Sequence, residues 1–124
     1  MQKKSVAYKE RLASFKDKPD GTYDVDTKKV ISYNEGFQVS FEQTDDDYTD
    51  GEYNAKVEEI KRLTGSIAHA GVFGGKPETS FHVKTKKQAM AIARQYNQYS
   101  IWDWADGNEV VNRDYDPTKG NKID

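Results

Sequence analysis

The chain has no cysteine among its 124 residues. Disulfide bonds and metal sites built on thiolates are therefore excluded, and a reducing compartment such as the cytoplasm is the expected location. No apolar run is long enough for the core of a signal peptide or for a membrane span. Since this length also suits one domain, we expect a single cytoplasmic domain over residues 1–124, without a membrane partner.

Apolar residues are also scarce, at 35% of the chain against 32% charged residues. Aromatic residues make up 12%, and their large buried areas can sustain a small core. The net charge of −2 is unevenly distributed, because residues 42–52 carry six acidic side chains and no basic one. This acidic segment is either a solvated loop or a surface that attracts a charged partner.

Residue periodicity predicts three helices, each with an apolar stripe at helical spacing. The second and third are expected to start at capping boxes, in which a threonine and a residue three positions later satisfy free amide groups. The expected helices are an N-terminal one within 1–18 that buries Tyr8, Leu12 and Phe15, one from Thr49 to about Leu63 that buries Tyr53, Val57, Ile60 and Thr64 with Leu63 beside them, and one after Thr85 that buries Ala89, Ile92, Ala93 and Tyr96.

Short alternating or β-branched segments separated by turn residues predict six or seven strands. The expected strands are an edge strand at 22–26, a hairpin of 30–33 with 37–41, strands at 66–73 and 78–84 around a turn at 74–77, and a hairpin of 100–104 with 109–112, before a loose tail at 115–124. The predicted fold class is α+β, a mainly antiparallel sheet packed by two or three helices. One strand–helix–strand unit at 78–104 would add a parallel pair if its two strands are neighbours.

Two histidines, His69 and His82, fall on adjacent predicted strands. With Glu78 or Asp103 they could form a metal site of a small hydrolase or nuclease, although no spacing of the ligands presets that geometry. No serine lies in a nucleophile elbow, and the glycines at 71–75 do not form a phosphate-binding loop. We therefore expect no catalytic residue and no cofactor, and the metal-dependent enzyme stays as an alternative.

A second alternative is direct binding of nucleic acid by Lys84, Lys86 and Lys87, which cluster where a helix is expected to start. The isoelectric point of about 5.7 disfavours this alternative, because nucleic-acid-binding domains are usually basic.

Trp102 and Trp104 are two positions apart on a predicted strand, so they project from the same side of it. Tyr99 and Ile101 alternate with them and are expected on the other side. A strand that is apolar on both sides either lies in the core or contributes aromatic anchors to an interface.

The motif GGKPETSFHV, followed by AMAIARQYNQYSIWDW, resembles small uncharacterised proteins encoded by phages and mobile elements of Gram-positive bacteria. Their pattern is PE-x-SF-x-V, a helix with alanines, and NQ-x-SIWD. The segment GFQVSFE also looks similar, so the resemblance covers about 36–111. The matching residues are Pro77, Glu78, Ser80, Phe81, Val83, Asn97, Gln98, Ser100, Ile101, Trp102 and Asp103.

The resemblance implies a small accessory protein that binds and inhibits a host macromolecule, such as a defence nuclease of the CRISPR or restriction type. It carries over no catalytic residue. Together with the acidic segment, it leads us to expect a non-enzymatic protein whose partner is a host protein or ribonucleoprotein complex. The residues predicted to contact that partner are Asp45, Asp46, Asp47, Asp50, Trp102 and Trp104.

Overall fold

The computed structural model describes residues 11–43 and 49–118, which form one α+β domain. Its six-stranded sheet has the order β1-β3-β4-β2-β5-β6, and every pairing between these strands is antiparallel. The strands are β1 (Gly21–Tyr23), β2 (Phe37–Gln43), β3 (Ala68–Phe73), β4 (Lys76–Val83), β5 (Ser100–Asp103) and β6 (Asn108–Val111). The helices are a short 3₁₀ helix η1 (Ala13–Phe15), α2 (Asp50–Thr64) and α3 (Lys86–Gln95).

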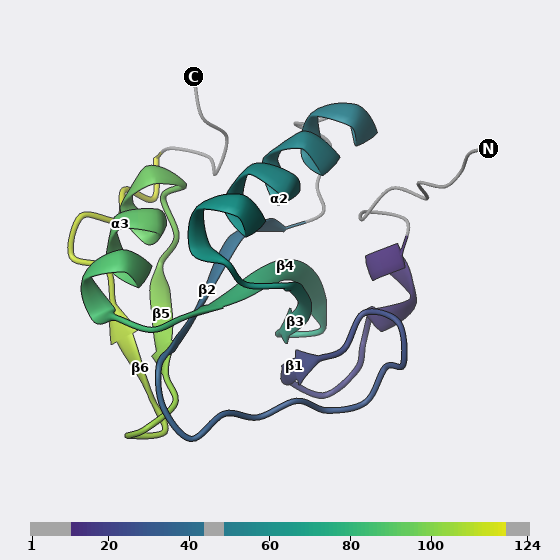
Figure 1. The fold of residues 1–124 in the computed structure, drawn as a ribbon, viewed down its shortest axis with the longest axis horizontal. Coiled ribbons are helices and arrows are strands. Elements are labelled where there is room, and N and C mark those ends of the chain that lie inside the picture. Colours follow the sequence, from purple (N-terminus) through teal and green to yellow (C-terminus); the bar gives the residue numbers. More distant parts are fainter. Residues whose placement is uncertain (1–10, 44–48, 119–124) are drawn as a thin grey trace.

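Both α-helices begin as the local sequence predicts. Thr49 and Glu52 form a reciprocal capping box at the start of α2, and Gly65 ends that helix in the left-handed conformation, with φ of +71°. At the start of α3 the Thr85 hydroxyl accepts a hydrogen bond from the Gln88 amide, which is one of the two bonds of the predicted capping box. The two helices lie on the same side of the sheet (Figure 1).

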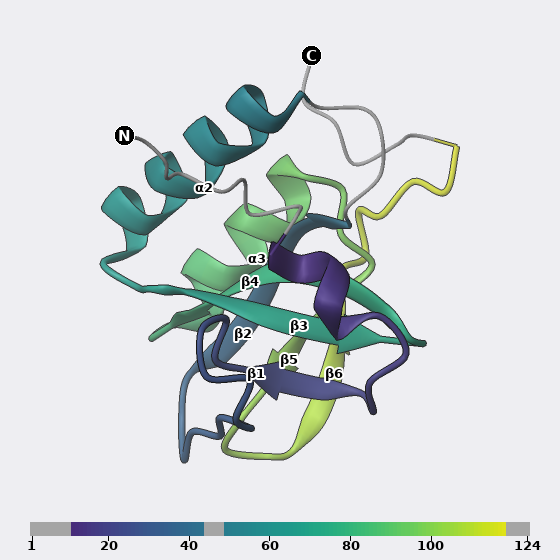
Figure 2. The same ribbon diagram turned by 90° about the vertical axis from the view of Figure 1, so that its right-hand side faces the viewer.

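The side chains of β2 and β4 alternate between the two faces of the sheet. Under the helices lie four apolar side chains, each at most 2% exposed: Val39, Phe41, Phe81 and Val83. The residues that alternate with them, including Gln38, Ser40 and Ser80, therefore project from the opposite face. No helix covers this second face within the described residues, and the sheet curls around it, so that β1 at one edge and β5 and β6 at the other turn away from α2 (Figure 2).

The predicted hairpin of 30–33 with 37–41 is wrong. β2 is an inner strand whose two edges bond to β4 and β5, so it has no edge left for the segment before it. Val30 makes only a single bridge to Tyr23 and is 73% exposed. The chain at 24–36 instead forms a loop that brings Tyr33 to the open face, where its ring stacks on His82.

The strand–helix–strand unit does not meet the condition for a parallel pair, which was that its two strands are neighbours. β4 and β5 run in the same direction but β2 lies between them, so α3 connects two strands that are not neighbours. The predicted turn at 74–77 is shorter, because Lys76 and Pro77 already belong to β4. Pro77 is tolerated there because the pairing of β4 with β2 begins only at Glu78.

Three further predictions concern Leu63, the C-terminal tail and the apolar residues of the N-terminal helix. Leu63 does not lie beside the buried stripe of α2 but is 69% exposed. The tail is not loose up to Thr118, since Tyr115 packs edge-on against Tyr99 at 5.4 Å and the Asp116 amide donates to the Asn97 side chain at 2.9 Å. Leu12 and Phe15 are buried as predicted, whereas Tyr8 lies outside the described residues.

Candidate functional site

The predicted contact residues are only partly described by the structure. Asp45, Asp46 and Asp47 lie outside the described residues, and Asp50 is described only as the first residue of α2. Trp102 and Trp104 do lie on one side of the chain, as predicted. Their rings meet at 6.4 Å between centroids, and Trp102 is 41% exposed. Neither tryptophan belongs to the core under the helices, and both border a hollow on the open face.

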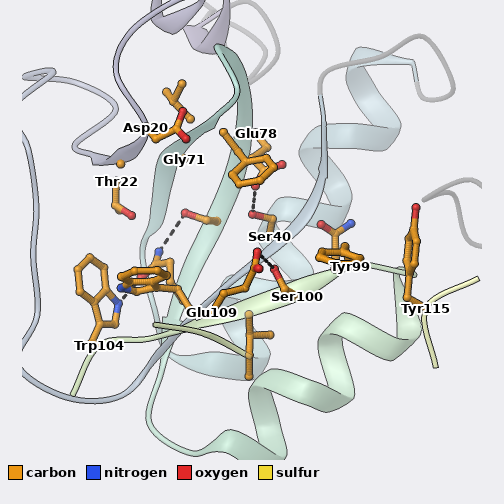
Figure 3. A pocket seen from close by; sticks show the side chains of 18 of the residues that line it. Asp20, Thr22, Ser40, Gly71, Glu78, Tyr99, Ser100, Trp104, Glu109 and Tyr115 are labelled. Carbon is orange, nitrogen blue, oxygen red and sulfur yellow. Dashed lines mark hydrogen bonds between the residues drawn. The ribbon is translucent and has the colours of Figure 1, made fainter. Parts of the chain in front are cut away.

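The open face contains a cavity of about 580 Å³ (Figure 3). All six strands contribute to its wall, and three aromatic side chains that line it are more than 40% exposed, namely Phe73, Tyr99 and Trp102. Tyr99, which was predicted on the opposite side of the strand from the tryptophans, also lines this hollow. Tyr99 precedes β5, so the alternation of that strand does not fix its direction.

The charged side chains around this hollow are all acidic. Asp20, Glu78 and Glu109 line it, whereas no lysine, arginine or histidine of the described residues does. Figure 3 shows Ser40 between Glu78 and the pair formed by Ser100 and Glu109. The Ser100 hydroxyl donates to Glu109 at 2.7 Å. The hollow therefore suits a ligand that is positively charged or rich in hydrogen-bond donors.

The pKa of Glu78 is shifted by its surroundings. Burial raises the pKa of its carboxyl to about 7, although the hydrogen bond that it accepts from the Ser40 hydroxyl opposes this rise. Gly71 is the residue opposite Glu78 on β3, and a Cβ atom there would lie 3.3 Å from the Ser80 hydroxyl oxygen. The missing side chain at Gly71 therefore helps to keep the hollow open.

Towards one end of the open face the hollow is closed by a network centred on Gln38, which is 6% exposed and, like Ser80 and Trp104, also borders the hollow. An indole N–H can only donate, so the 3.1 Å contact from Trp104 Nε1 identifies the Gln38 atom that faces it as the side-chain oxygen. The Gln38 nitrogen then faces Ser80 Oγ at 3.0 Å and His69 Nδ1 at 3.3 Å.

This assignment also fixes the protonation state of His69. Because the Gln38 nitrogen is a donor, His69 Nδ1 must be an acceptor, which leaves the proton of the neutral ring on Nε2. His69 Nε2 then donates to the Tyr33 hydroxyl at 2.9 Å. Burial lowers the pKa of His69, with the nearby His82 as a smaller cause in the same direction, and both effects favour the neutral ring.

The structure brings the two predicted histidines to one face but does not gather ligands around them. The ring of Tyr33 stacks on His82 at 3.7 Å between centroids and meets His69 edge-on at 5.7 Å. Of the predicted companions, Glu78 bonds to Ser40, and Asp103 accepts from the amide of Asp106 in the β5–β6 turn. Within 11–43 and 49–118 there is no group of three or more side chains suited to hold a metal ion.

The three predicted nucleic-acid contacts, Lys84, Lys86 and Lys87, are exposed around the start of α3 and do not line the hollow. Sequence reasoning missed Gln38, Ser40 and Thr22 as residues of the open face. The polar positions of the alternating segment 37–41 were the available signal for the first two. No helix in the described part of the chain is long and apolar enough to cross a membrane.

Comparisons with known proteins give no match. No family model matches the chain, and neither a curated protein nor a solved structure does so.

Proposed function

We propose that this protein is a non-enzymatic binding protein that holds a host macromolecule on the open face of its sheet. The observation that carries this proposal is the hollow of about 580 Å³, whose wall combines exposed aromatic rings with charged groups of one sign. Tryptophan and tyrosine are the residues that most often anchor interfaces. Exposed aromatic side chains gathered on one face are a recognised mark of an interaction site.

The charge of the hollow indicates which surface of a partner it accepts. Nucleases bind the phosphate backbone through lysine and arginine, so their substrate sites are basic. An acidic hollow can occupy such a site and exclude the nucleic acid. The resemblance to proteins of phages and mobile elements supports this choice of partner. We propose a host defence nuclease or its nucleic-acid complex in the cytoplasm of a Gram-positive bacterium.

The test is affinity capture with matched baits. The wild-type protein is compared with Trp102→Ala, which changes the wall of the hollow, and with Leu63→Ala, which removes an even more exposed apolar side chain from α2. We expect the Trp102 variant to capture a nuclease at least tenfold less well, while the Leu63 variant captures it like the wild type. The purified wild-type protein should then inhibit cleavage of DNA or RNA by the captured enzyme.

Equal capture by all three baits would show that the open face is not the contact. Turnover of a substrate by the purified protein, lost on His82→Ala and on removal of divalent metal, would instead establish the alternative of a metal-dependent enzyme. Charge reversal of Asp45, Asp46 and Asp47 tests the acidic segment separately. If that segment contributes, reversal weakens capture most at low salt, because ions screen exposed charges.

A further inference from the structure

Glu78 lacks a charged partner that its position calls for. Glu78 is half-buried, and a carboxylate that is partly removed from water is normally paired with a cation or bonded by several donors, because the loss of its hydration is costly. Among the described residues Glu78 receives a hydrogen bond from Ser40 but forms no ion pair. A cation supplied from outside the chain would therefore complete this part of the hollow.

The titratable groups on the same face do not supply that cation. Asp20 before β1 and Glu109 on β6 carry the same charge as Glu78. His69 on β3 is held neutral by Gln38, and His82 on β4 lies at the other end under Tyr33. None of the six strands thus places a counter-charge in the hollow, and the acids together favour a positive ligand.

Two buried polar groups beside the acids are also incompletely bonded. Thr22 is 9% exposed, lines the hollow, and its hydroxyl has no hydrogen-bond partner within the described residues. Gln98 is 8% exposed and donates from its side-chain nitrogen to the carbonyl groups of Phe41 and Tyr96, which leaves its side-chain oxygen as an acceptor without a described donor. Buried polar groups are rarely left in this state, so they indicate that a ligand with several donors completes the hollow.

From this arrangement we propose that the hollow binds the guanidinium group of an arginine side chain of the partner, with Glu78 as its counter-charge. This inference rests on the proposed function, since it names the chemical group that the same hollow accepts. A guanidinium presents five N–H donors in a planar fork and binds a carboxylate through two parallel hydrogen bonds. The exposed ring of Trp102 in the same wall suits the flanking residues of the partner's segment, as well as a cation.

Arginine suits these observations better than lysine does. An ammonium group has three donors and is strongly hydrated, so its transfer into a partly buried site is more costly. The acceptors around the hollow come from separate strands and are spread over its wall, which favours a ligand whose donors point in several directions. A neutral polyhydroxylated ligand would use the same acceptors but would leave Glu78 without a counter-charge.

The test compares two peptides that differ only in charge. Acetyl-Gly-Arg-Gly-amide and the same peptide with citrulline, the neutral isostere of arginine, are titrated into ¹⁵N-labelled protein at pH 7.5. We expect the arginine peptide to bind at least fivefold more tightly and to shift the amide signals of β2, β4 and β5. Glu78→Gln should abolish the difference between the peptides, whereas Glu35→Gln, which removes an exposed acid outside the hollow, should preserve it.

A second measurement needs no variant. Binding of a cation beside Glu78 should favour its ionised form, so the wild-type protein should release protons on binding the arginine peptide near pH 7. Calorimetry in two buffers of different ionisation enthalpy measures this release. Equal affinity for the two peptides, shifts confined to residues outside the hollow, or a preference for arginine that survives in Glu78→Gln would each overturn the inference.

The peptide titration and the capture experiment can fail independently of each other. If Trp102→Ala abolishes capture of the macromolecule but the peptides bind equally, the open face is the contact and arginine is not its ligand. If the arginine peptide binds as expected but capture is unaffected by Trp102→Ala, the hollow recognises arginine and the proposed function is wrong.

Discussion

The two ends of the open sheet face differ in how their polar groups are satisfied. At the closed end, Gln38 links Trp104, Ser80 and His69, and Tyr33 covers the histidines. At the hollow end, Glu78 is bonded by the Ser40 hydroxyl alone among the residues that the structure describes. Buried polar groups stabilise a fold when their hydrogen bonds are complete and destabilise it when they are not. The closed end should therefore contribute stability, and the hollow end should reduce it in exchange for binding.

The largest effect is expected at Gly36, beside the closed end. This residue has φ of +87°, and a Cβ atom there would lie 2.4 Å from His82 Nε2 and 2.9 Å from the carbonyl oxygen of Val83. Gly36→Ala should therefore lower the free energy of unfolding by about 3 kcal/mol, from backbone strain and overpacking together. Urea unfolding measures the change.

Gly107→Ala is the matched control, because Gly107 also has a positive φ, of +67°, but nothing lies within 4 Å of the Cβ position. It should cost only about 1 kcal/mol, from the backbone alone. Equal losses at the two glycines would show that the contact with His82 and Val83 does not contribute.

The second prediction concerns Glu78 at the hollow end, where a substitution should raise the free energy of unfolding at high pH and not lower it. The pKa of Glu78 rises on folding from 4.5 to about 7, so the folded protein binds the proton more tightly than the unfolded chain does. The stability contributed by this group is therefore fully present below pH 4.5 and is lost as the pH rises through 7. A shift of this size corresponds to at most roughly 3 kcal/mol.

Glu78→Gln, which mimics the neutral acid, should then be more stable than the wild type by about 2 kcal/mol at pH 8 and equally stable at pH 4.5. Thermal unfolding of both proteins at these two pH values tests the sign. Glu109→Gln, an exposed acid of the same hollow, should change stability by less than about 0.5 kcal/mol at either pH. A Glu78→Gln variant that is less stable than the wild type at pH 8 would mean that the carboxylate is stabilised within the fold.

The third prediction tests the proton assignment at the closed end. In Gln38→Glu the introduced carboxylate faces His69 Nδ1 as an acceptor, so protonation of the ring becomes favourable and the pKa of His69 should rise. The variant should lose about 1–2 kcal/mol at pH 8 and less at pH 5.5. NMR titration of the His69 ring follows the pKa, and nitrogen shifts of the wild type should show the proton on Nε2. An unchanged pKa would contradict the network.

The sequence could predict those features that depend on residues close together in the chain. The caps at Thr49, Thr85 and Gly65 depend on residues three or four positions away, and they were predicted correctly. The alternation at 37–41 correctly predicted which side chains face the helices, but not that Gln38 on the opposite face is buried as well. It did not predict which strands lie beside β2, because period two fixes the face of a residue and not its neighbour.

The hollow could not be predicted for the same reason. Ser40 and Glu78 are 38 positions apart and meet only because β2 lies beside β4. The residues between the two segments of the predicted hairpin, 34–36, end in a glycine that does have a positive φ, and a hairpin turn needs such a φ as well. In the structure the glycine at position 36 instead allows close approach to His82. Long-range pairing, rather than local conformation, decided which polar residues became the candidate site.

The smallest predicted effect separates the two tryptophans, which the sequence treats alike. Both border the hollow, but Trp104 donates its indole N–H to the buried oxygen of Gln38, whereas Trp102 is 41% exposed. Trp104→Phe leaves that oxygen unpaired and should cost about 1 kcal/mol, while Trp102→Phe should cost less than about 0.5 kcal/mol. Urea unfolding at pH 7.5 compares the two variants. Equal losses would mean that the closed end and the hollow end are not energetically distinct, and a larger loss at Trp102 would make its ring part of the folded core.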